Sequence, residues 1–187
     1  FTAEDFRYYW EDMATNENLS RKGLPQAFLV DGESPTFEVI DEKTVRYTWV
    51  KPNPNFVPWI ARPRPLLLYR PAHYLKQFHA KYADETKLNG IARKEHKQNW
   101  IQLHADRDRW YRMDNPDRPT LQPWQNTTNP PSERFVFKRN PFYHRVDQNG
   151  RQLPYIDEVV INLGVTNMVP ARTGSGESDL QARYLRF

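Results

Sequence analysis

Histidine, a common metal ligand, occurs five times in the 187 residues, but the spacing does not favour a metal site. A helix brings two histidines to one ion when they are three or four positions apart. His73 and His79 are six positions apart, and His96 and His104 are eight apart. His144 is interpreted as a surface packing residue. The sequence therefore predicts no bound metal, and nothing in it calls for a cofactor.

Side chains that could act as nucleophiles or as acid–base pairs also lack the arrangement that catalysis requires. The chain has no cysteine, which excludes thiol catalysis, disulfides and thiolate metal sites within it. Residues 174–177, Gly-Ser-Gly-Glu, do not form the Gly-x-Ser-x-Gly nucleophile turn, and no Gly-Lys-Ser/Thr phosphate loop is present. Asp106 and Asp108 lie among arginines, which favours surface ion pairs over paired catalytic carboxylates. We therefore predict that the chain is not an enzyme.

Four aromatic residues in or beside proline-bounded loops are the expected ligand contacts: Trp59, Tyr69, Trp124 and Tyr155. An aromatic ring on a loop can stack on a sugar or flank a peptide backbone. Each ring could instead pack beneath a long loop, because the chain has few aliphatic residues and its core must use aromatic ones. Both interpretations stay open for each of the four.

The composition describes a polar, loop-rich chain that has enough aromatic residues to form a core. Hydrophobic residues make up 38% and aromatic residues 14%, and the mean hydropathy is −0.90. The net charge is +4, but the 27 basic and 23 acidic residues are interspersed, so we predict no binding to nucleic acid. No apolar stretch approaches the roughly 18 residues of a membrane-spanning helix. The 16 prolines and 7 glycines predict many loops.

The first elements follow from hydrophobic periodicity. Apolar residues at helical spacing predict a helix over residues 3–14, with Thr2 as its N-cap. Its buried face should contain Phe6, Tyr9, Trp10 and Met13. Two β-branched and aromatic runs, 37–40 and 44–50, predict a hairpin. In the second run Val45, Tyr47 and Trp49 alternate with polar residues and should face the interior.

The remaining elements alternate between helix and strand, which predicts an α+β fold with a mixed sheet. We expect, in order, a short helix at 56–61, a buried strand at 66–69, a helix at 72–82, a polar helix across 85–112, strands at 135–137 and 158–163, and a helix at 178–184. In the polar helix, Trp100, Leu103 and Trp110 should form the packed face. Residues 115–131 contain five prolines and should form a long extended connector.

Three segments resemble one known family. Residues 139–159 read R-N-P-F-Y-H-R-V-D-Q-N-G-R-Q-L-P-Y-I-D-E-V. This run resembles a segment of the extracellular solute-binding proteins, family 5, that supply ABC importers. Residues 1–6 resemble the family's Thr-Ala-Glu-Asp helix start, and residues 176–183 resemble its Gly-Glu-x-Asp-Leu-Gln segment. The resemblance is thin between about residues 80 and 120.

The resemblance implies a particular place for the chain within a larger protein. It implies a loop-rich α+β part of a periplasmic-binding-protein-like lobe. Residues 1–120 would be one subdomain of the first lobe, and residues 121–187 would return to the core of that lobe towards the hinge. The chain would be an internal fragment, and the second lobe would lie beyond Phe187.

The resemblance also implies a function. Such a protein captures a peptide-like solute between two lobes and delivers it to an ABC permease in the membrane. It would be periplasmic or otherwise extracytoplasmic, and the full-length protein could carry a membrane anchor. An oligosaccharide is the alternative solute in the same family. A secreted hydrolase is the alternative from a different class, but it needs an activated nucleophile or a metal centre, and neither is visible in the sequence.

Overall fold

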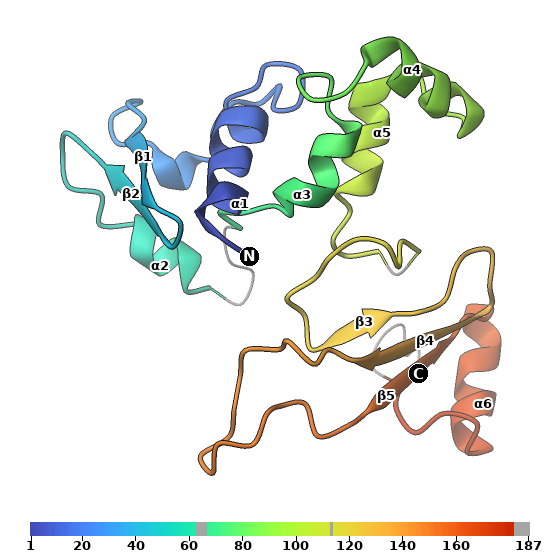
Figure 1. The fold of residues 1–187 in the computed structure, drawn as a ribbon. Helices are drawn as coiled ribbons and strands as arrows, with labels where there is room; N and C mark the ends of the chain where they lie inside the picture. Colours follow the sequence, from blue (N-terminus) through green and yellow to red (C-terminus); the bar gives the residue numbers. More distant parts are fainter. Residues whose placement is uncertain (63–66, 113, 182–187) are drawn as a thin grey trace. The chain divides into compact units, whose positions relative to one another are not determined.

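The computed structural model describes residues 1–62, 67–112 and 114–181, and it separates into two compact units (Figure 1). Unit 1 is Phe1–Trp110 and unit 2 is Tyr111–Phe187. Unit 1 combines helices with a two-stranded hairpin, and unit 2 contains a three-stranded antiparallel sheet, so the fold is α+β. None of the helices in the described residues has the length and apolar character needed to cross a bilayer. The two units divide between Trp110 and Tyr111. The subdomain boundary that we expect near residue 120 of the whole lobe stays a prediction.

The first helical run covers the predicted residues 3–14, but its second half is a π-helix. α1 (Ala3–Arg7) begins with a capping box. In it, Thr2 Oγ1 accepts a hydrogen bond from the Glu4 backbone N–H, and the Thr2 N–H donates to the Asp5 carboxylate. η1 (Tyr8–Ala14) continues this helix with the wider π turn.

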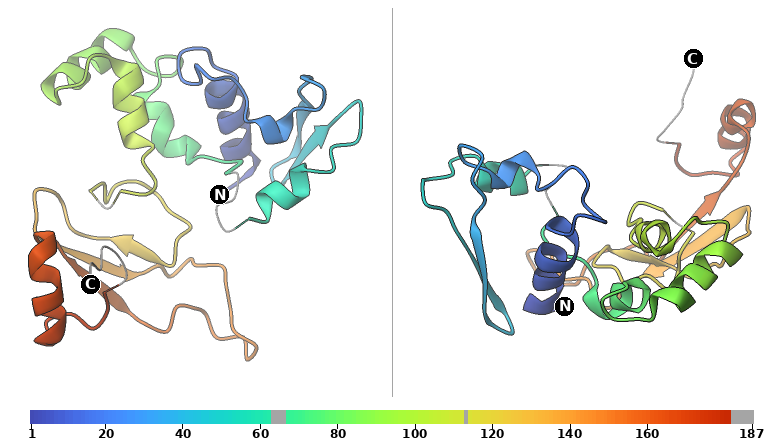
Figure 2. Two further views of the ribbon diagram at one scale, coloured as in Figure 1. Left: turned by 180° about the vertical axis from the view of Figure 1, so that it is seen from behind. Right: turned by 90° about the horizontal axis from the view of Figure 1, so that it is seen from above.

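Two sides of this run are buried rather than one. Tyr8 packs in a cluster with residues of α3 (Ala72–Leu75), whereas Tyr9 and Trp10 pack towards the hairpin. Figure 2 shows the run between the hairpin and the helices of residues 72–107. The predicted buried face is therefore correct for Tyr9 and Trp10, but it omitted Tyr8. Phe6 and Met13 are only half-buried, because a single-face pattern does not describe a helix with neighbours on both sides.

The predicted hairpin is confirmed. β1 (Thr36–Asp41) pairs with β2 (Thr44–Thr48) in an antiparallel register that places Phe37 opposite Tyr47. Val45, Tyr47 and Trp49 are half-buried while their neighbours are exposed, as the alternation predicted. Two short helices, η2 (Gln26–Phe28) and α2 (Phe56–Ile60), complete this half of unit 1. Aromatic rings dominate its core, with centroid separations of 4.7–6.2 Å among Trp10, Phe28, Phe37, Tyr47, Trp49 and Phe56.

The other helices of unit 1 are shorter than predicted. α3 (Ala72–Leu75) and η3 (Lys76–Phe78) end before Tyr82, and the polar helix is broken into α4 (Glu85–Lys94) and α5 (Trp100–Arg107). The break contains His96 at φ 58°, a left-handed conformation that a helix cannot include. Asn99 then caps α5 by accepting a hydrogen bond from the Gln102 N–H at 3.1 Å.

The packed residues of this region were predicted in part. Trp100 and Leu103 are buried, but Trp110 is half-exposed because α5 ends three residues before it. The strand expected at 66–69 is wrong for the described residues 67–69, which form no regular structure. The next residue is bonded to a helix instead of a strand: the Arg70 N–H donates to the carbonyl of Asp5 in α1 at 3.0 Å.

Unit 2 is built on three antiparallel strands in the order β3-β4-β5. β4 (Arg134–Arg139) and β5 (Glu158–Asn162) confirm the two predicted strands, and Phe135 on β4 is buried. β3 (Trp124–Asn126) lies within the stretch predicted as a plain connector, so that prediction missed a strand. β3 is short and flanked by prolines, so it leaves little strand signal in the sequence.

The rest of unit 2 is loop and short helix. A long loop, residues 140–157, joins β4 to β5 and extends away from the sheet in Figure 1. η4 (Thr166–Met168) and α6 (Val169–Gly174) follow β5. The helix predicted at 178–184 is wrong for residues 178–181, which are irregular, and its remainder lies outside the described residues.

Candidate functional site

The two candidate aromatic residues of unit 1 have different surroundings. Trp59 lies on α2 with 37% of its surface exposed, and the Arg62 guanidinium sits 3.9 Å from its ring centroid. Tyr69 is half-buried, and its ring contacts those of Phe1 at 4.8 Å and Phe6 at 5.8 Å. Tyr69 is thus mainly packed, whereas Trp59 presents an open ring with a cation above it.

The two candidates of unit 2 are brought to one place. The Trp124 indole N–H donates to the carbonyl of Ile156 at 3.0 Å, and Ile156 directly follows Tyr155 in the sequence. Tyr155 donates its hydroxyl to Asp147 Oδ2 at 2.5 Å. This hydrogen bond raises the pKa of Tyr155 and, together with the Arg151 backbone N–H, lowers the pKa of Asp147. The loop of residues 140–157 therefore carries Tyr155, and a hydrogen bond to Trp124 joins this loop to β3.

One ring on this loop was not among the sequence candidates. Phe142 is 83% exposed, and Tyr155 and Ile156 are also exposed. We refer to these three exposed residues as the exposed loop surface of unit 2. The only sequence signal for Phe142 is its position directly after Asn140-Pro141, where a strand ends and a loop begins.

Internal hydrogen bonds hold this loop in shape. The buried Asn140 amide donates to the carbonyls of Thr120 and Gln122, and its oxygen accepts from the Phe142 N–H. Gln152 crosses the loop by donating to the carbonyls of Pro141 and Tyr143 at 2.7 and 2.8 Å. Rings on a frame of this kind lose little conformational freedom when a ligand binds.

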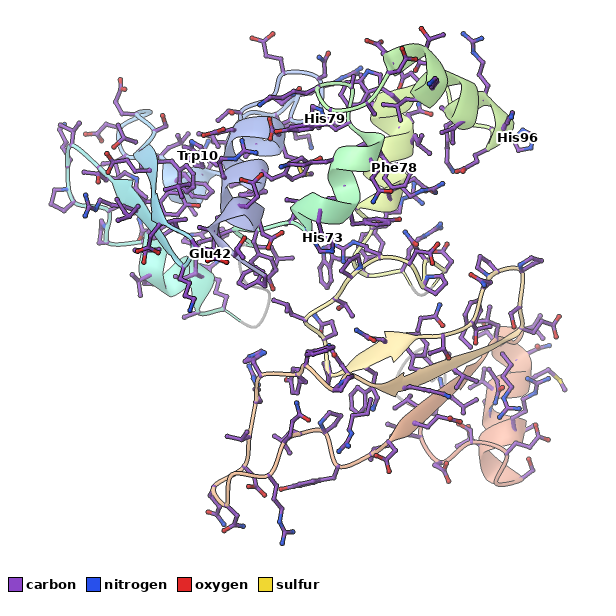
Figure 3. The ribbon with its side chains drawn as sticks, viewed as in Figure 1. Trp10, Glu42, His73, Phe78, His79 and His96 are labelled. Carbon is purple, nitrogen blue, oxygen red and sulfur yellow. The ribbon has the colours of Figure 1, made fainter. Side chains whose placement is uncertain are left out.

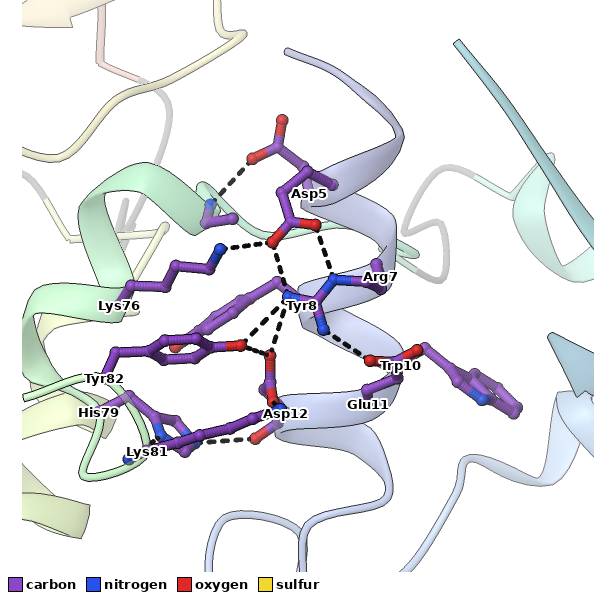
Figure 4. A network of polar contacts seen from close by, with 12 residues as sticks. Asp5, Arg7, Tyr8, Trp10, Glu11, Asp12, Lys76, His79, Lys81 and Tyr82 are labelled. Carbon is purple, nitrogen blue, oxygen red and sulfur yellow. Dashed lines mark hydrogen bonds and ion pairs between the residues drawn. The ribbon is translucent and has the colours of Figure 1, made fainter. Parts of the chain in front are cut away.

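A second polar feature lies inside unit 1, around the buried carboxylate of Asp12 (Figure 4). Lys81 Nζ and the Tyr82 hydroxyl each donate to it at 2.6 Å, and Arg7 lies 3.3 Å away. Burial alone raises the pKa of Asp12, but the hydrogen bonds from Lys81 and Tyr82 and the nearby charges outweigh it and lower the pKa. The Asp12 carboxylate is therefore ionised, and its hydrogen bonds join η1 to Lys81 and Tyr82, which follow η3.

Arg7 extends this network to the first turn of α1. It makes two hydrogen bonds of 2.6 Å to the Glu4 carboxylate and another to Glu11. Lys76 Nζ also contacts Glu4 at 2.5 Å. The hydrogen bonds from Arg7 are the main cause that lowers the pKa of Glu4 to about 2.

Two histidines that sequence spacing did not pair, His79 and His104, lie close together beside this network. His79 directly follows η3 and His104 lies on α5; both are buried, and their ring centroids are 5.5 Å apart (Figure 3 labels His79). His79 Nδ1 accepts from the Lys81 backbone N–H, so Nε2 carries the proton and donates to the Asp12 carbonyl at 3.1 Å. His104 Nε2 lies 2.7 Å from the Tyr8 hydroxyl.

The chemistry available to this histidine–tyrosine cluster is limited by its burial. Tyr8 and His104 have no exposed surface, so no solute in solution can reach them. Within the described residues, no group of three or more His, Cys, Asp or Glu side chains is placed to share a metal ion. His73, His96 and His144 are exposed and lie apart from the cluster in sequence. The cluster acts as a structural element of unit 1.

Asp106 on α5 and Asp108 directly after it form ion pairs, as predicted, but both carboxylates are largely buried rather than on the surface. Asp106 lies 3.2 Å from Arg109 within the same segment. Asp108 instead contacts Arg70 at 2.8 Å, and both side chains are largely buried. This second pair ties the end of α5 to the segment that precedes α3.

The chain matches known proteins along almost its whole length. Residues 1–183 match the family described as bacterial extracellular solute-binding proteins, family 5 Middle. A periplasmic alpha-galactoside-binding protein of Rhizobium meliloti (strain 1021) is 29% identical over 181 residues, which is 95% of this chain and 23% of that protein.

Two solved structures share the fold. An oligopeptide-binding protein OppA aligns with a TM-score of 0.80 and 30% identity, covering 98% of this chain and 28% of that one. The periplasmic binding protein MelB of Agrobacterium fabrum C58, solved in complex with stachyose, aligns with a TM-score of 0.68 and 27% identity over 96% of this chain and 24% of that one. The chain thus spans about a quarter of the length of these relatives.

Proposed function

Because the chain belongs to the family 5 bacterial extracellular solute-binding proteins, we propose that the full-length protein captures an oligosaccharide for an ABC importer. In this proposal the protein acts outside the cytoplasm, closes two lobes around its solute and passes it to a membrane permease. It binds and releases the solute without changing it. The present chain supplies part of one lobe.

The exposed loop surface of unit 2 is the observation that carries the proposal of a solute-binding role. The open rings of Phe142 and Tyr155 are held on a hydrogen-bonded loop, and a sugar ring stacks on an aromatic face of this kind. We propose Tyr155, Phe142 and Trp124 as contacts of the solute. Trp59 stays a proposed contact on unit 1, and Tyr69 is a candidate whose ring already packs against Phe1 and Phe6.

The relatives give support to two solute classes. One is named as an alpha-galactoside-binding protein and another was solved with stachyose, which favours an oligosaccharide. The similarity to an oligopeptide-binding protein favours a peptide, the first expectation from the sequence, as the second candidate. Exposed rings can also flank a peptide backbone, so binding measurements decide between the two.

Calorimetry on the full-length protein tests the proposal. The panel contains melibiose, raffinose and stachyose together with a tripeptide and a pentapeptide. We expect an oligosaccharide to bind, and we expect Phe142→Ala to weaken that binding about tenfold, which corresponds to about 1.4 kcal/mol. Val146→Ala is the matched control, because Val146 is also exposed on this loop but has no ring.

Three results contradict the proposal. Binding of peptides without any saccharide assigns the protein to the second candidate. Equal affinity of Phe142→Ala and wild type removes the loop surface from the solute site. Release of monosaccharides from any member of the panel identifies a hydrolase.

A further inference from the structure

Unit 1 contains an open groove that is separate from the residues discussed so far as solute contacts. It consists of two adjoining cavities of about 400 and 600 Å³, which share Asn18, Asn99 and Ile101 as lining residues. The loop of residues 16–22 forms one wall, and residues 98–102 at the start of α5 form the other. Volumes of this size can admit a small ligand.

Five side-chain amides line this groove: Asn16, Asn18, Gln98, Asn99 and Gln102. Some of their atoms are already used. Asn16 Oδ1 accepts from the backbone N–H groups of Asn18 and Leu19, and Asn99 Oδ1 accepts from that of Gln102. The Gln98 and Gln102 side chains hydrogen-bond to each other at 3.0 Å.

The rest of the amide atoms are available to a ligand. The side-chain NH₂ groups of Asn16 and Asn99 and both ends of the Asn18 amide make no hydrogen bond to any described residue. The groove therefore presents donors from both walls and one free acceptor. The atoms that are already bonded fix the orientation of Asn16 and Asn99, so these donors are preorganised.

The same groove has an indole and apolar side chains in its lining. Trp100 lines the first cavity with only 6% of its surface exposed, and its indole N–H has no hydrogen-bond partner in the described part of the chain. Leu19 and Ile101 contribute apolar atoms. His79 also lines this cavity, but both of its ring nitrogens are already engaged, so it forms a fixed wall.

Charge on the groove is mixed, which argues against a strongly ionic ligand. Lys81 lines the first cavity but is bound to Asp12, and Glu85 lines the same cavity. Arg21 and Lys22 line the far end of the second cavity. The central part, shared by both cavities, is made of neutral amides and an isoleucine.

We infer that this groove is a second binding site for a neutral saccharide, distinct from the solute contacts of unit 2. Sugar hydroxyls both donate and accept hydrogen bonds, as the free amide groups require, and the C–H face of a sugar matches Leu19 and Ile101. The inference does not depend on which solute the importer carries.

The test uses the full-length protein and titration with melibiose, raffinose and stachyose, followed by saturation-transfer NMR of the sugar signals. Asn18→Trp places an indole in the groove and removes no hydrogen bond of the fold, because the Asn18 side chain makes none among the described residues. Glu17→Trp is the matched control, since Glu17 is an exposed neighbour that does not line either cavity.

We expect a weak saccharide-binding event that Asn18→Trp reduces about tenfold or more, whereas Glu17→Trp and Phe142→Ala leave it unchanged. Equal behaviour of Asn18→Trp and Glu17→Trp overturns the inference. So does binding that inorganic phosphate displaces, because it assigns the groove to anions held by Arg21 and Lys22. If Asn18→Trp weakens this saccharide binding and Phe142→Ala does not, the groove and the solute site of unit 2 are two different sites.

Discussion

The hydroxyl of Tyr8 lies 2.7 Å from Nε2 of His104, and neither side chain has any exposed surface. The second ring nitrogen of His104, Nδ1, is buried and has no hydrogen-bond partner within the described residues. A protonated imidazole needs two acceptors, so this environment favours neutral His104. Burial is the main cause that lowers the pKa of His104 to about 4, and the nearby charges of His79 and Arg70 lower it further against the opposing effect of Asp108.

Unit 1 should therefore lose stability in mild acid. The unfolded chain takes up a proton at His104 near pH 6.5, whereas the folded chain does so only near pH 4. The stabilisation is complete above pH 6.5 and is lost as the pH falls towards 4, by about 3 kcal/mol in total. The lowered pKa of His79 acts in the same direction. Urea unfolding of the chain at several pH values between 7.5 and 4 measures this loss.

Two variants separate this histidine from the other groups that titrate in acid. His104→Gln cannot be protonated, so its free energy of unfolding should depend less on pH over this range than that of the wild type. His73→Gln replaces an exposed histidine on α3 and should follow the wild-type curve. A wild-type slope in His104→Gln would show that other groups control the acid response.

Local sequence patterns predicted most helices and strands, but not which elements pack against one another. The hairpin, β4 and β5 were predictable because strand periodicity and turn residues are local signals. β3 and the π-helical form of η1 were not, because the first is short and the second depends on neighbours on both sides of the helix. The break between α4 and α5 depends on the left-handed backbone at His96. The residues around His96 are common in helices, so no local signal in the sequence marks this break.

The candidate site was predictable to a smaller extent. The sequence singled out Trp124 and Tyr155, but the hydrogen bond that joins Trp124 to the loop carrying Tyr155 is a tertiary contact. His79 and His104 are 25 positions apart, so no helical spacing could have paired them. The groove beside Asn18 combines a loop with a helix start far along the chain, and amide side chains give no motif.

Replacing Asp12 with asparagine should destabilise unit 1. The amide cannot match the charge of Lys81 and Arg7, and its NH₂ group must face a hydroxyl or a cation in a buried position. We expect a loss of about 2 kcal/mol in the free energy of unfolding, measured in urea at pH 7. Asp31→Asn is the control, because Asp31 pairs with Lys51 while both side chains are well exposed. Similar losses for the two variants would contradict a special role for the buried carboxylate.

Two glycines should respond to alanine with opposite signs. Gly90 lies within α4, and a Cβ there meets no atom within 4 Å, so Gly90→Ala should stabilise by about 0.5–1 kcal/mol. Gly150 has φ +78° in the turn of the long loop, where alanine is strained, so Gly150→Ala should destabilise by about 1 kcal/mol. Thermal melting of the two variants beside the wild type gives both signs, and shifts in the same direction would show that backbone conformation does not decide the outcome.

Asn140 should tolerate an acidic replacement least of all the asparagines in unit 2. Its NH₂ group donates to the carbonyls of Thr120 and Gln122 at 3.2 and 3.0 Å, and only 1% of the residue is exposed. Asn140→Asp points a carboxylate oxygen at these two carbonyls. We expect a loss of about 3 kcal/mol at pH 7 from lost hydrogen bonds and buried charge.

The pH dependence of Asn140→Asp distinguishes this cause from general damage to the loop. A protonated aspartic acid regains one O–H donor, so the deficit relative to the wild type should shrink as the pH falls towards 4, while the deficit of Asn140→Ala stays constant. Asn162→Asp is the control, because Asn162 is exposed on β5 opposite Arg134 and should change stability by less than about 0.5 kcal/mol. Urea unfolding at pH 7 and pH 5 gives all three comparisons. If Asn140→Asp and Asn140→Ala show the same deficit at both pH values, carboxylate repulsion does not explain the need for asparagine at this position.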